Sequence, residues 1–283
     1  MLHWPLASGQ DIGGCRAIVS SNKKVDQIVR LLRKRAEFKG ENGKIRFKNY
    51  IENPKLDGYR SYHLIGQFKA KHGVQRFIEV QLRTSLQHDW ATALEIVDLF
   101  TGQALKSNQG EDDWKRFFKG VSDQFAIMEN IHLFKFGDID KHQKYLKMVQ
   151  ASKDATASCT ETQRLGKKLS VQSKFLAFTN SLKIANEQLA RNSVDGYVLI
   201  EVNTINTTVR TTLFNRDDSK EASQRYTEAE RKAAGTDGLV VALVSATAVG
   251  GIKEAYPNYF ADSTDFLKHY MLIAKAPTSK GIF

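Results

Sequence analysis

Cysteine is nearly absent from this sequence, and so are several features that define whole classes of protein. The 283 residues contain two cysteines, Cys15 and Cys159, too few to cross-link a fold of this size and without a CxxC spacing for zinc. We expect both to be reduced packing residues. No uncharged apolar run approaches the roughly 18–20 residues that cross a bilayer, and the opening MLHWPLASGQD lacks the charged start and apolar middle of a signal peptide. These absences predict a cytoplasmic protein without a membrane partner.

The common nucleotide-binding and hydrolase motifs are missing too. There is no GxxxxGKS loop and no GxGxxG, which excludes the P-loop and Rossmann routes to nucleotide binding. No Ser/His/Asp or Cys/His pattern rises above chance. The composition is nevertheless that of a globular chain, with 41% hydrophobic and 26% charged residues, so a mostly disordered protein is excluded.

Positive charge is concentrated in one stretch of the chain. The formal net charge is +11, from 42 Lys and Arg against 31 Asp and Glu. Residues 21–76 hold 15 of the basic residues and five of the acidic ones, hence +10. Because Lys and Arg gain hydrogen bonds and release counterions on meeting phosphates, this stretch favours a polyphosphate or nucleic acid ligand. A merely solubilising basic surface is the alternative.

The hydrophobic pattern predicts an α+β fold. Apolar residues alternate cleanly from Gln75 to Arg83, which places Ile78, Val80 and Leu82 on one face of a strand and leaves Glu79, Gln81 and Arg83 on the other. Aromatic and aliphatic stripes at helical spacing follow to about residue 125, and we expect them to be core. The other strands expected in the first part are 15–19 and about 61–68, with a helix through Val25–Leu32.

The polarity of the chain changes twice, which suggests domain boundaries. Residues from about 138 to 191 are rich in Lys, Gln, Ser and Ala, typical of one or two long surface helices or a helical hairpin. Beyond them a β, β, α, β, α order predicts a small α+β domain. We therefore expect a first domain at 1–135, a helical connector at 136–192 and a small C-terminal domain at 193–283.

Two carboxylates lie among the basic residues and could serve a phosphoryl-type transfer. Asp11 precedes the first predicted strand, and Glu79 lies within the alternating one. Carboxylates at neighbouring strands can hold Mg2+, and one can accept the proton of an attacking hydroxyl, while the surrounding cations neutralise the transferred group. Taken alone, Asp11 reads as a turn residue and Glu79 as part of a solvated sheet face. Tyr59, in a predicted loop, offers a flat face to a nucleobase, with a core tyrosine as the alternative.

Three segments together resemble a known family. The order QDIGGCR, KNYIENPKLDGYRSYH and IEVQLRTSLQHDWATALE is similar to the synthetase domain of the RelA/SpoT family, across about residues 10–100. The resemblance implies a nucleotidyltransferase-like mixed β-sheet with flanking helices. It also implies (p)ppGpp synthesis, in which ATP donates a pyrophosphate to the 3′ hydroxyl of GDP or GTP with Mg2+ as cofactor. No hydrolase HD motif is present, so alarmone degradation is not implied.

The resemblance also assigns roles to residues. Asp11 and Glu79 correspond to the family's metal carboxylates, and Glu79 to the group that activates the 3′ hydroxyl. Tyr59 corresponds to the tyrosine that stacks on the acceptor guanine. The other residues implied in substrate binding are Arg16, Lys48, Lys55, Asp57, His63, Gln81 and Arg83.

Two departures from the family pattern affect what the resemblance implies. The family binds ATP partly through an upstream Arg-x-Lys segment, whereas the ten residues before Asp11 contain no Lys or Arg. We expect this chain to be a shortened form of a longer protein, or to have lost ATP-dependent transfer. Asp57 replaces a usual asparagine or small residue, which puts acceptor specificity in question. Two alternatives therefore stay open: a toxin-like enzyme that pyrophosphorylates the 3′ end of tRNA, and a non-catalytic remnant that binds a nucleotide, RNA or a partner. A homo-oligomer is also left open.

Overall fold

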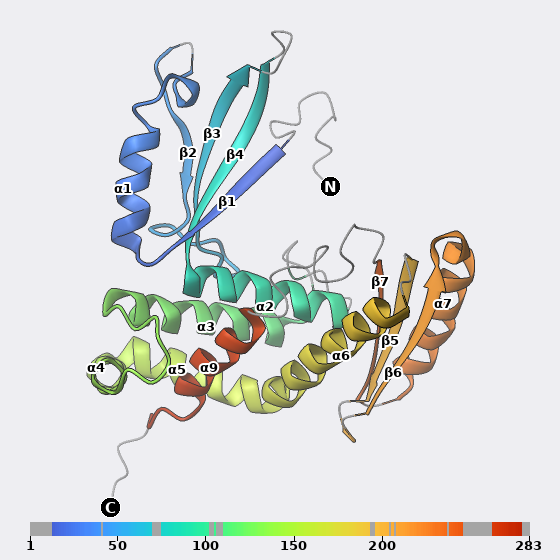
Figure 1. The fold of residues 1–283 in the computed structure, drawn as a ribbon. Coiled ribbons are helices and arrows are strands. Elements are labelled where there is room, and N and C mark those ends of the chain that lie inside the picture. The colour runs from blue at the N-terminus through green and yellow to red at the C-terminus, as the bar shows by residue number, and fades with distance from the viewer. Residues whose placement is uncertain are drawn as a thin grey trace, which may run out of the picture. The chain divides into compact units, whose positions relative to one another are not determined.

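The computed structural model divides into two compact units (Figure 1). The first comprises residues 1–88 and 122–148, and the second comprises residues 89–121 and 149–283. The structure describes residues 13–40, 42–69, 75–101, 105, 110–192, 196–203, 205–206, 208–236, 238–245 and 262–278. The chain passes from one unit to the other after residues 88, 121 and 148. This division does not test the predicted domain boundaries near 135 and 192, which stay a prediction.

The first unit is built on a mixed four-stranded sheet. Its strand order is β1-β4-β3-β2, in which β1 pairs with β4 in parallel and the other two pairings are antiparallel. This confirms the expected α+β class with a mixed sheet. The strands are β1 (Gly13–Val19), β2 (Arg46–Asn49), β3 (Tyr62–Lys69) and β4 (Gln75–Thr84).

One face of this sheet carries the core of the unit. The alternating apolar residues of β3 and β4 pack against α1 (Asn22–Leu32), whose Val25 and Val29 are buried, and against Phe38 in the short helix η2 (Ala36–Phe38). Ser21 caps α1 by accepting a hydrogen bond from the Lys24 amide. Because residues two apart in a strand share a face, burial of this side leaves the polar side of β4 on the opposite face.

Strand β2 was not predicted, since its sequence RFKN is polar. It lies at the edge of the sheet and most of its residues are exposed, so no apolar alternation marks it. The two cysteines also differ from each other: Cys159 is buried as expected, whereas Cys15 on β1 is exposed, so packing does not account for it.

Three helices contribute residues to both units. They are α2 (Ser85–Thr101), α3 (Asp112–Asn130) and α4 (Ile139–Ala151). The predicted stripes on α2 and α3 are buried as expected, with Trp90, Trp114 and Phe117 each at most 3% exposed. Trp90 also donates a hydrogen bond from its indole to the Phe118 carbonyl at 2.7 Å, both within the second unit.

The segment expected to form one or two long surface helices or a helical hairpin forms three helices. After α4 come α5 (Lys153–Lys168) and α6 (Val171–Asn192), separated by Ser170 at a positive φ of 52°. Leu165, Phe175 and Phe178 are fully buried, so these helices form core and not a solvated link. The composition did not indicate this burial, because polar residues on the exposed sides of these helices outnumber the apolar residues on their buried sides. The helix α9 (Asp262–Ala274) belongs to the same unit and contacts both α5 and α6.

The second unit also holds a three-stranded antiparallel sheet, which confirms the predicted C-terminal strands. Its order is β6-β5-β7, and the helix α7 (Ser219–Ala234) packs on one face through Ala222 and Ala229. The strands are β5 (Gly196–Asn203), β6 (Thr208–Asn215) and β7 (Leu239–Ser245), with the turn η4 (Arg216–Asp218) before α7. Within the described ranges, no helix is long and apolar enough to cross a membrane.

Candidate functional site

Four of the predicted site residues form one row across the whole sheet of the first unit. Lys48 on β2 pairs with His63 on β3, His63 pairs with Gln81 on β4, and Gln81 pairs with Arg16 on β1. Directly paired residues project to the same face of a sheet, so this row lies on the face opposite the core. Glu79 and Arg83 flank Gln81 at two-residue spacing on that same face.

Five side chains on this face close a hydrogen-bonded ring. Glu79 Oε1 lies 2.6 Å from His63 Nδ1, and Glu79 Oε2 accepts from Gln81 Nε2 at 2.7 Å. Arg83 Nη2 donates to Gln81 Oε1 at 3.1 Å and to the Tyr59 hydroxyl at 2.6 Å. That hydroxyl lies 2.9 Å from His63 Nε2, which completes the ring. We call these five residues the carboxylate ring.

The hydrogen bonds of the carboxylate ring all donate in the direction from Arg83 to Glu79. An ionised Glu79 can only accept, so Nδ1 of His63 carries the proton and Nε2 accepts from the Tyr59 hydroxyl. The hydroxyl oxygen in turn accepts from Arg83. Two paths therefore lead from the guanidinium to the carboxylate, one through Tyr59 and His63 and the other through Gln81.

The pKa values of the ring residues agree with this direction. Burial lowers the pKa of His63, which outweighs the opposing effect of Glu79 and keeps the imidazole neutral. Burial alone raises the pKa of Glu79, but the hydrogen bond from Gln81 and the groups around it lower the pKa overall. Because His63 is neutral, it stabilises the Glu79 carboxylate through its N–H and not through a full charge. The buried Arg83 supplies the positive charge of the ring.

The loop between β2 and β3 places an aromatic cluster next to the ring. The Tyr50 ring lies edge-on to both Tyr59 and His63, with centroids 5.8 and 5.2 Å away. Lys55 Nζ lies 5.0 Å from the Tyr50 centroid and 4.8 Å from the Tyr59 centroid. Asp57 Oδ1 accepts from the Tyr59 amide at 2.9 Å, so this carboxylate shapes the turn that presents Tyr59. Sequence reasoning missed Tyr50, although it lies inside the KNYIENPK segment.

A residue far along the chain holds this loop in place. Arg60 donates from Nε to Ser122 Oγ at 3.0 Å and from Nη1 to the Ile51 carbonyl at 3.0 Å. Ser122 on α3 donates in turn to the Gly58 carbonyl. Gly58 has a φ of 93°, a conformation that glycine adopts most easily. Nothing in the local sequence indicates that Ser122 fixes a loop 62 residues before it.

A buried carboxylate anchors the end of β4. Glu129 on α3 accepts hydrogen bonds from Thr84 and Gln87 at the β4–α2 junction and from Asn22 at the start of α1. Burial raises its pKa, and the hydrogen bonds offset this only in part. Since Thr84 directly follows Arg83, this contact fixes the strand end that supports the carboxylate ring.

The described residues fit a magnesium site in part. They contain no group of three or more His, Cys, Asp or Glu side chains that could hold a metal ion, and the predicted ligand Asp11 lies outside them. Glu79 is the predicted metal carboxylate that lies within the described residues. Each of its two oxygens takes part in one hydrogen bond, and a carboxylate oxygen can accept two. Mg2+ usually takes one or two protein carboxylates together with substrate phosphates, so Glu79 fits as one ligand.

Comparisons with known proteins agree with the motif order. The model of the "region found in RelA / SpoT proteins" matches residues 6–96. No curated protein matches the chain. Among solved structures, the small alarmone synthetase 1 of Bacillus subtilis bound to its product pppGpp is 23% identical, with a TM-score of 0.38, and covers 44% of this chain and 63% of its own.

Two further solved structures are similar to a comparable extent. The small alarmone synthetase 2 of Bacillus subtilis is 23% identical with a TM-score of 0.37, covering 44% of this chain and 65% of its own. A GTP pyrophosphokinase family protein of Streptococcus pneumoniae is 24% identical with a TM-score of 0.35, covering 48% and 64%. The chain thus spans less than two thirds of the length of these proteins. The family match includes every residue of the carboxylate ring, so residues 6–96 of this chain are similar to the region found in RelA / SpoT proteins.

Proposed function

We propose that this protein is a (p)ppGpp synthetase-like enzyme that transfers a pyrophosphate from ATP to the 3′ hydroxyl of GDP or GTP. The observation that supports it most is the carboxylate ring: an ionised Glu79, oriented through both oxygens, next to an aromatic loop and several cations. The match to the region found in RelA / SpoT proteins supports this reaction class.

Each residue would have a defined role in this reaction. Tyr59 would stack on the guanine, with Lys55 close to its ring, and Lys48 on the neighbouring strand would meet acceptor phosphates. Glu79 would accept the proton of the 3′ hydroxyl. The ring fixes Glu79 before the substrate arrives, which lowers the reorganisation that the reaction requires.

The proposed step conserves atoms and charge. The acceptor 3′ oxygen loses its proton to Glu79 and forms a bond to the β-phosphorus of ATP. The bond between that phosphorus and the oxygen bridging to the α-phosphate breaks, and AMP leaves. Bound Mg2+, with Glu79 as one ligand and Asp11 proposed as another, would neutralise charge on the phosphates. Arg16 and Arg83 would add fixed positive charge on the same sheet face.

A transfer assay with matched variants tests the proposal. The purified chain is incubated with Mg2+, ATP labelled on the β-phosphate and either GDP or GTP, and the labelled products are separated. We expect label on the guanosine nucleotide, its loss in Glu79→Gln, and its loss when EDTA removes Mg2+. The Glu52→Gln variant, an exposed loop carboxylate, serves as control and should transfer normally. Normal transfer by Glu79→Gln would refute the assigned role.

The +10 segment favours a second candidate acceptor. A long basic stretch can hold an RNA backbone, so tRNA is tested as acceptor in the same assay. Label on the tRNA 3′ end, with steep salt dependence, would assign the protein to the toxin-like class. No transfer to any acceptor would favour a non-catalytic binding role.

A further inference from the structure

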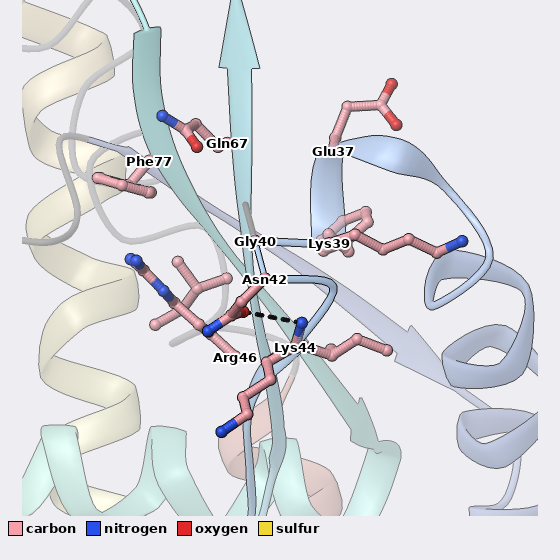
Figure 2. A pocket seen from close by; sticks show the side chains of 11 residues that line it. Glu37, Lys39, Gly40, Asn42, Lys44, Arg46, Gln67 and Phe77 are labelled. Atoms are coloured by element: carbon pink, nitrogen blue, oxygen red, sulfur yellow. Dashed lines mark hydrogen bonds between the residues drawn. The ribbon is translucent and has the colours of Figure 1, made fainter.

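A cavity of about 590 Å3 lies on the same sheet face as the carboxylate ring but shares no residue with it. Ile65, Gln67 and Phe77 line it from β3 and β4, and Arg46 lines it from β2, together with Gly40, Asn42, Lys44 and Ile45 before that strand (Figure 2). This volume is in the range of pockets that hold a nucleotide-sized ligand. None of the sequence motifs assigned a role to these residues.

The register of the sheet explains where this cavity lies. Arg46 pairs with Ile65, and Ile65 pairs with Glu79, so the cavity begins in the row next to Lys48, His63 and Gln81. Rows two residues apart are about 7 Å apart along a strand. The cavity therefore adjoins the carboxylate ring and extends away from the Tyr59 loop.

The charges in the cavity are those of an anion site. Lys44 and Arg46 line it, and no described carboxylate lies within 4.0 Å of either cation. The one acidic residue in the described lining, Glu37, forms an ion pair with Arg35 at 2.9 Å, which lowers its pKa. Figure 2 shows Arg46 reaching toward Phe77, whereas Lys39 points to the other side.

The remaining groups suit a nucleobase. Arg46 Cζ lies 5.0 Å from the Phe77 centroid, so the aromatic ring that would hold a base lies directly beside a cation that would bind phosphate. Gln67 donates its amide N–H to Gln75, which leaves its own carbonyl oxygen as an acceptor. Asn42 accepts from the Lys44 amide at 3.0 Å through Oδ1, which leaves its NH2 group as a donor.

From these features we infer that the cavity is a second nucleotide site, separate from the acceptor site, in which Lys44 and Arg46 bind the phosphates of a nucleoside triphosphate. The base packs on Phe77 and Ile65, within reach of the amides of Asn42 and Gln67. The inference does not depend on the transfer chemistry, because no residue of the carboxylate ring lines the cavity.

Methyl NMR of the full chain tests this site directly. With isoleucine methyl groups labelled, ATP and GTP are titrated separately into Glu79→Gln protein, which prevents turnover. We expect either nucleotide to shift the signals of Ile45 and Ile65, and the comparison of ATP with GTP identifies the base. The Lys44→Ala/Arg46→Ala variant should weaken binding at these signals by about tenfold or more at roughly 0.15 M salt. Lys23→Ala/Lys24→Ala, which removes the same charge from exposed positions on α1, should bind like the parent protein.

Further titrations distinguish this cavity from the acceptor site and from a general affinity for RNA. Tyr59→Ala, which removes the stacking ring of the acceptor site, should leave the Ile45 shift intact. Unphosphorylated guanosine should not shift Ile45, whereas inorganic tripolyphosphate should compete with the nucleotide. The inference is wrong if Ile45 does not respond to either nucleotide, if the Lys44/Arg46 variant binds normally, or if only a single-stranded RNA shifts Ile45. The inference of a second nucleotide site would still hold if the wild-type protein showed no transfer activity.

Discussion

The guanidinium of Arg83 contacts Tyr59 at two places, donating to its hydroxyl at 2.6 Å and lying 5.1 Å from the centroid of its ring. One buried cation therefore fixes both the position of the hydroxyl and the orientation of the aromatic face. The same cation reaches Glu79 through Gln81. In the proposed reaction, binding of the acceptor base and orientation of the carboxylate would therefore both depend on this side chain.

Replacing Arg83 tests this dependence. Lysine keeps the charge but cannot donate to Tyr59 and Gln81 from one planar group. We expect Arg83→Lys to lower kcat/KM for transfer about tenfold or more, since each lost charge-assisted hydrogen bond contributes about 1.5–3 kcal/mol. Circular dichroism checks that the variant is folded. Wild-type transfer by Arg83→Lys would show that the charge alone suffices.

Two substitutions of Tyr59 separate its ring from its hydroxyl. Tyr59→Phe keeps the stacking face but removes the link between Arg83 and His63, so kcat should fall about tenfold while KM for GDP stays unchanged. Tyr59→Ala also removes stacking worth about 1–3 kcal/mol, which raises KM for GDP by about 10- to 100-fold. Steady-state kinetics at saturating ATP measures both. Equal KM values for the two variants would contradict the stacking role.

Ser122 connects α3 to the Tyr59 loop, so its hydroxyl should affect acceptor binding. Ser122→Ala removes the partner of both Arg60 and the Gly58 carbonyl, and we expect a higher KM for the acceptor and a loss of about 1–3 kcal/mol in unfolding free energy. Ser122→Thr keeps the hydroxyl and should restore KM. If both variants lower stability equally and neither changes KM, the serine serves packing alone.

Glu129 should make stability depend on pH. Burial raises its pKa in the folded protein above the ordinary value of 4.5. The folded state therefore binds this proton more tightly than the unfolded state, and the stability gained is complete below pH 4.5 and is lost as pH rises through the raised pKa. Arg60 opposes the shift but does not reverse it. We expect the unfolding free energy of wild type to fall more steeply with rising pH than that of Glu129→Gln, measured by urea denaturation. Parallel curves would exclude this effect.

The sequence predicted the sheet and its polar face because both follow from local alternation. Glu79, Gln81 and Arg83 could be placed on one side of a strand by counting alone, and the structure adds that Tyr59 and His63 close a ring with them. The edge strand β2 escaped prediction because an exposed strand needs no apolar pattern. The helices at 139–192 were misjudged because composition does not show which side of a helix is buried.

The contacts to Ser122 and Glu129 could not have been predicted from one sequence. Both join residues that are 42 or more positions apart in the chain. Each hydrogen bond replaces one to water, and no pattern in the neighbouring sequence indicates it. The cavity beside Arg46 likewise depends on the cross-strand register, which spacing along the chain does not determine.

The interleaved order of the two units determines where the chain can be cut. The RelA/SpoT match ends at residue 96, but the compact unit that contains its sheet also needs residues 122–148. A fragment trimmed to the matched region would keep every member of the carboxylate ring and lose the α3 side chains that hold its loop and its strand end. Expression boundaries drawn from the motif alone would therefore produce a chain that carries the carboxylate ring without the contacts that support it.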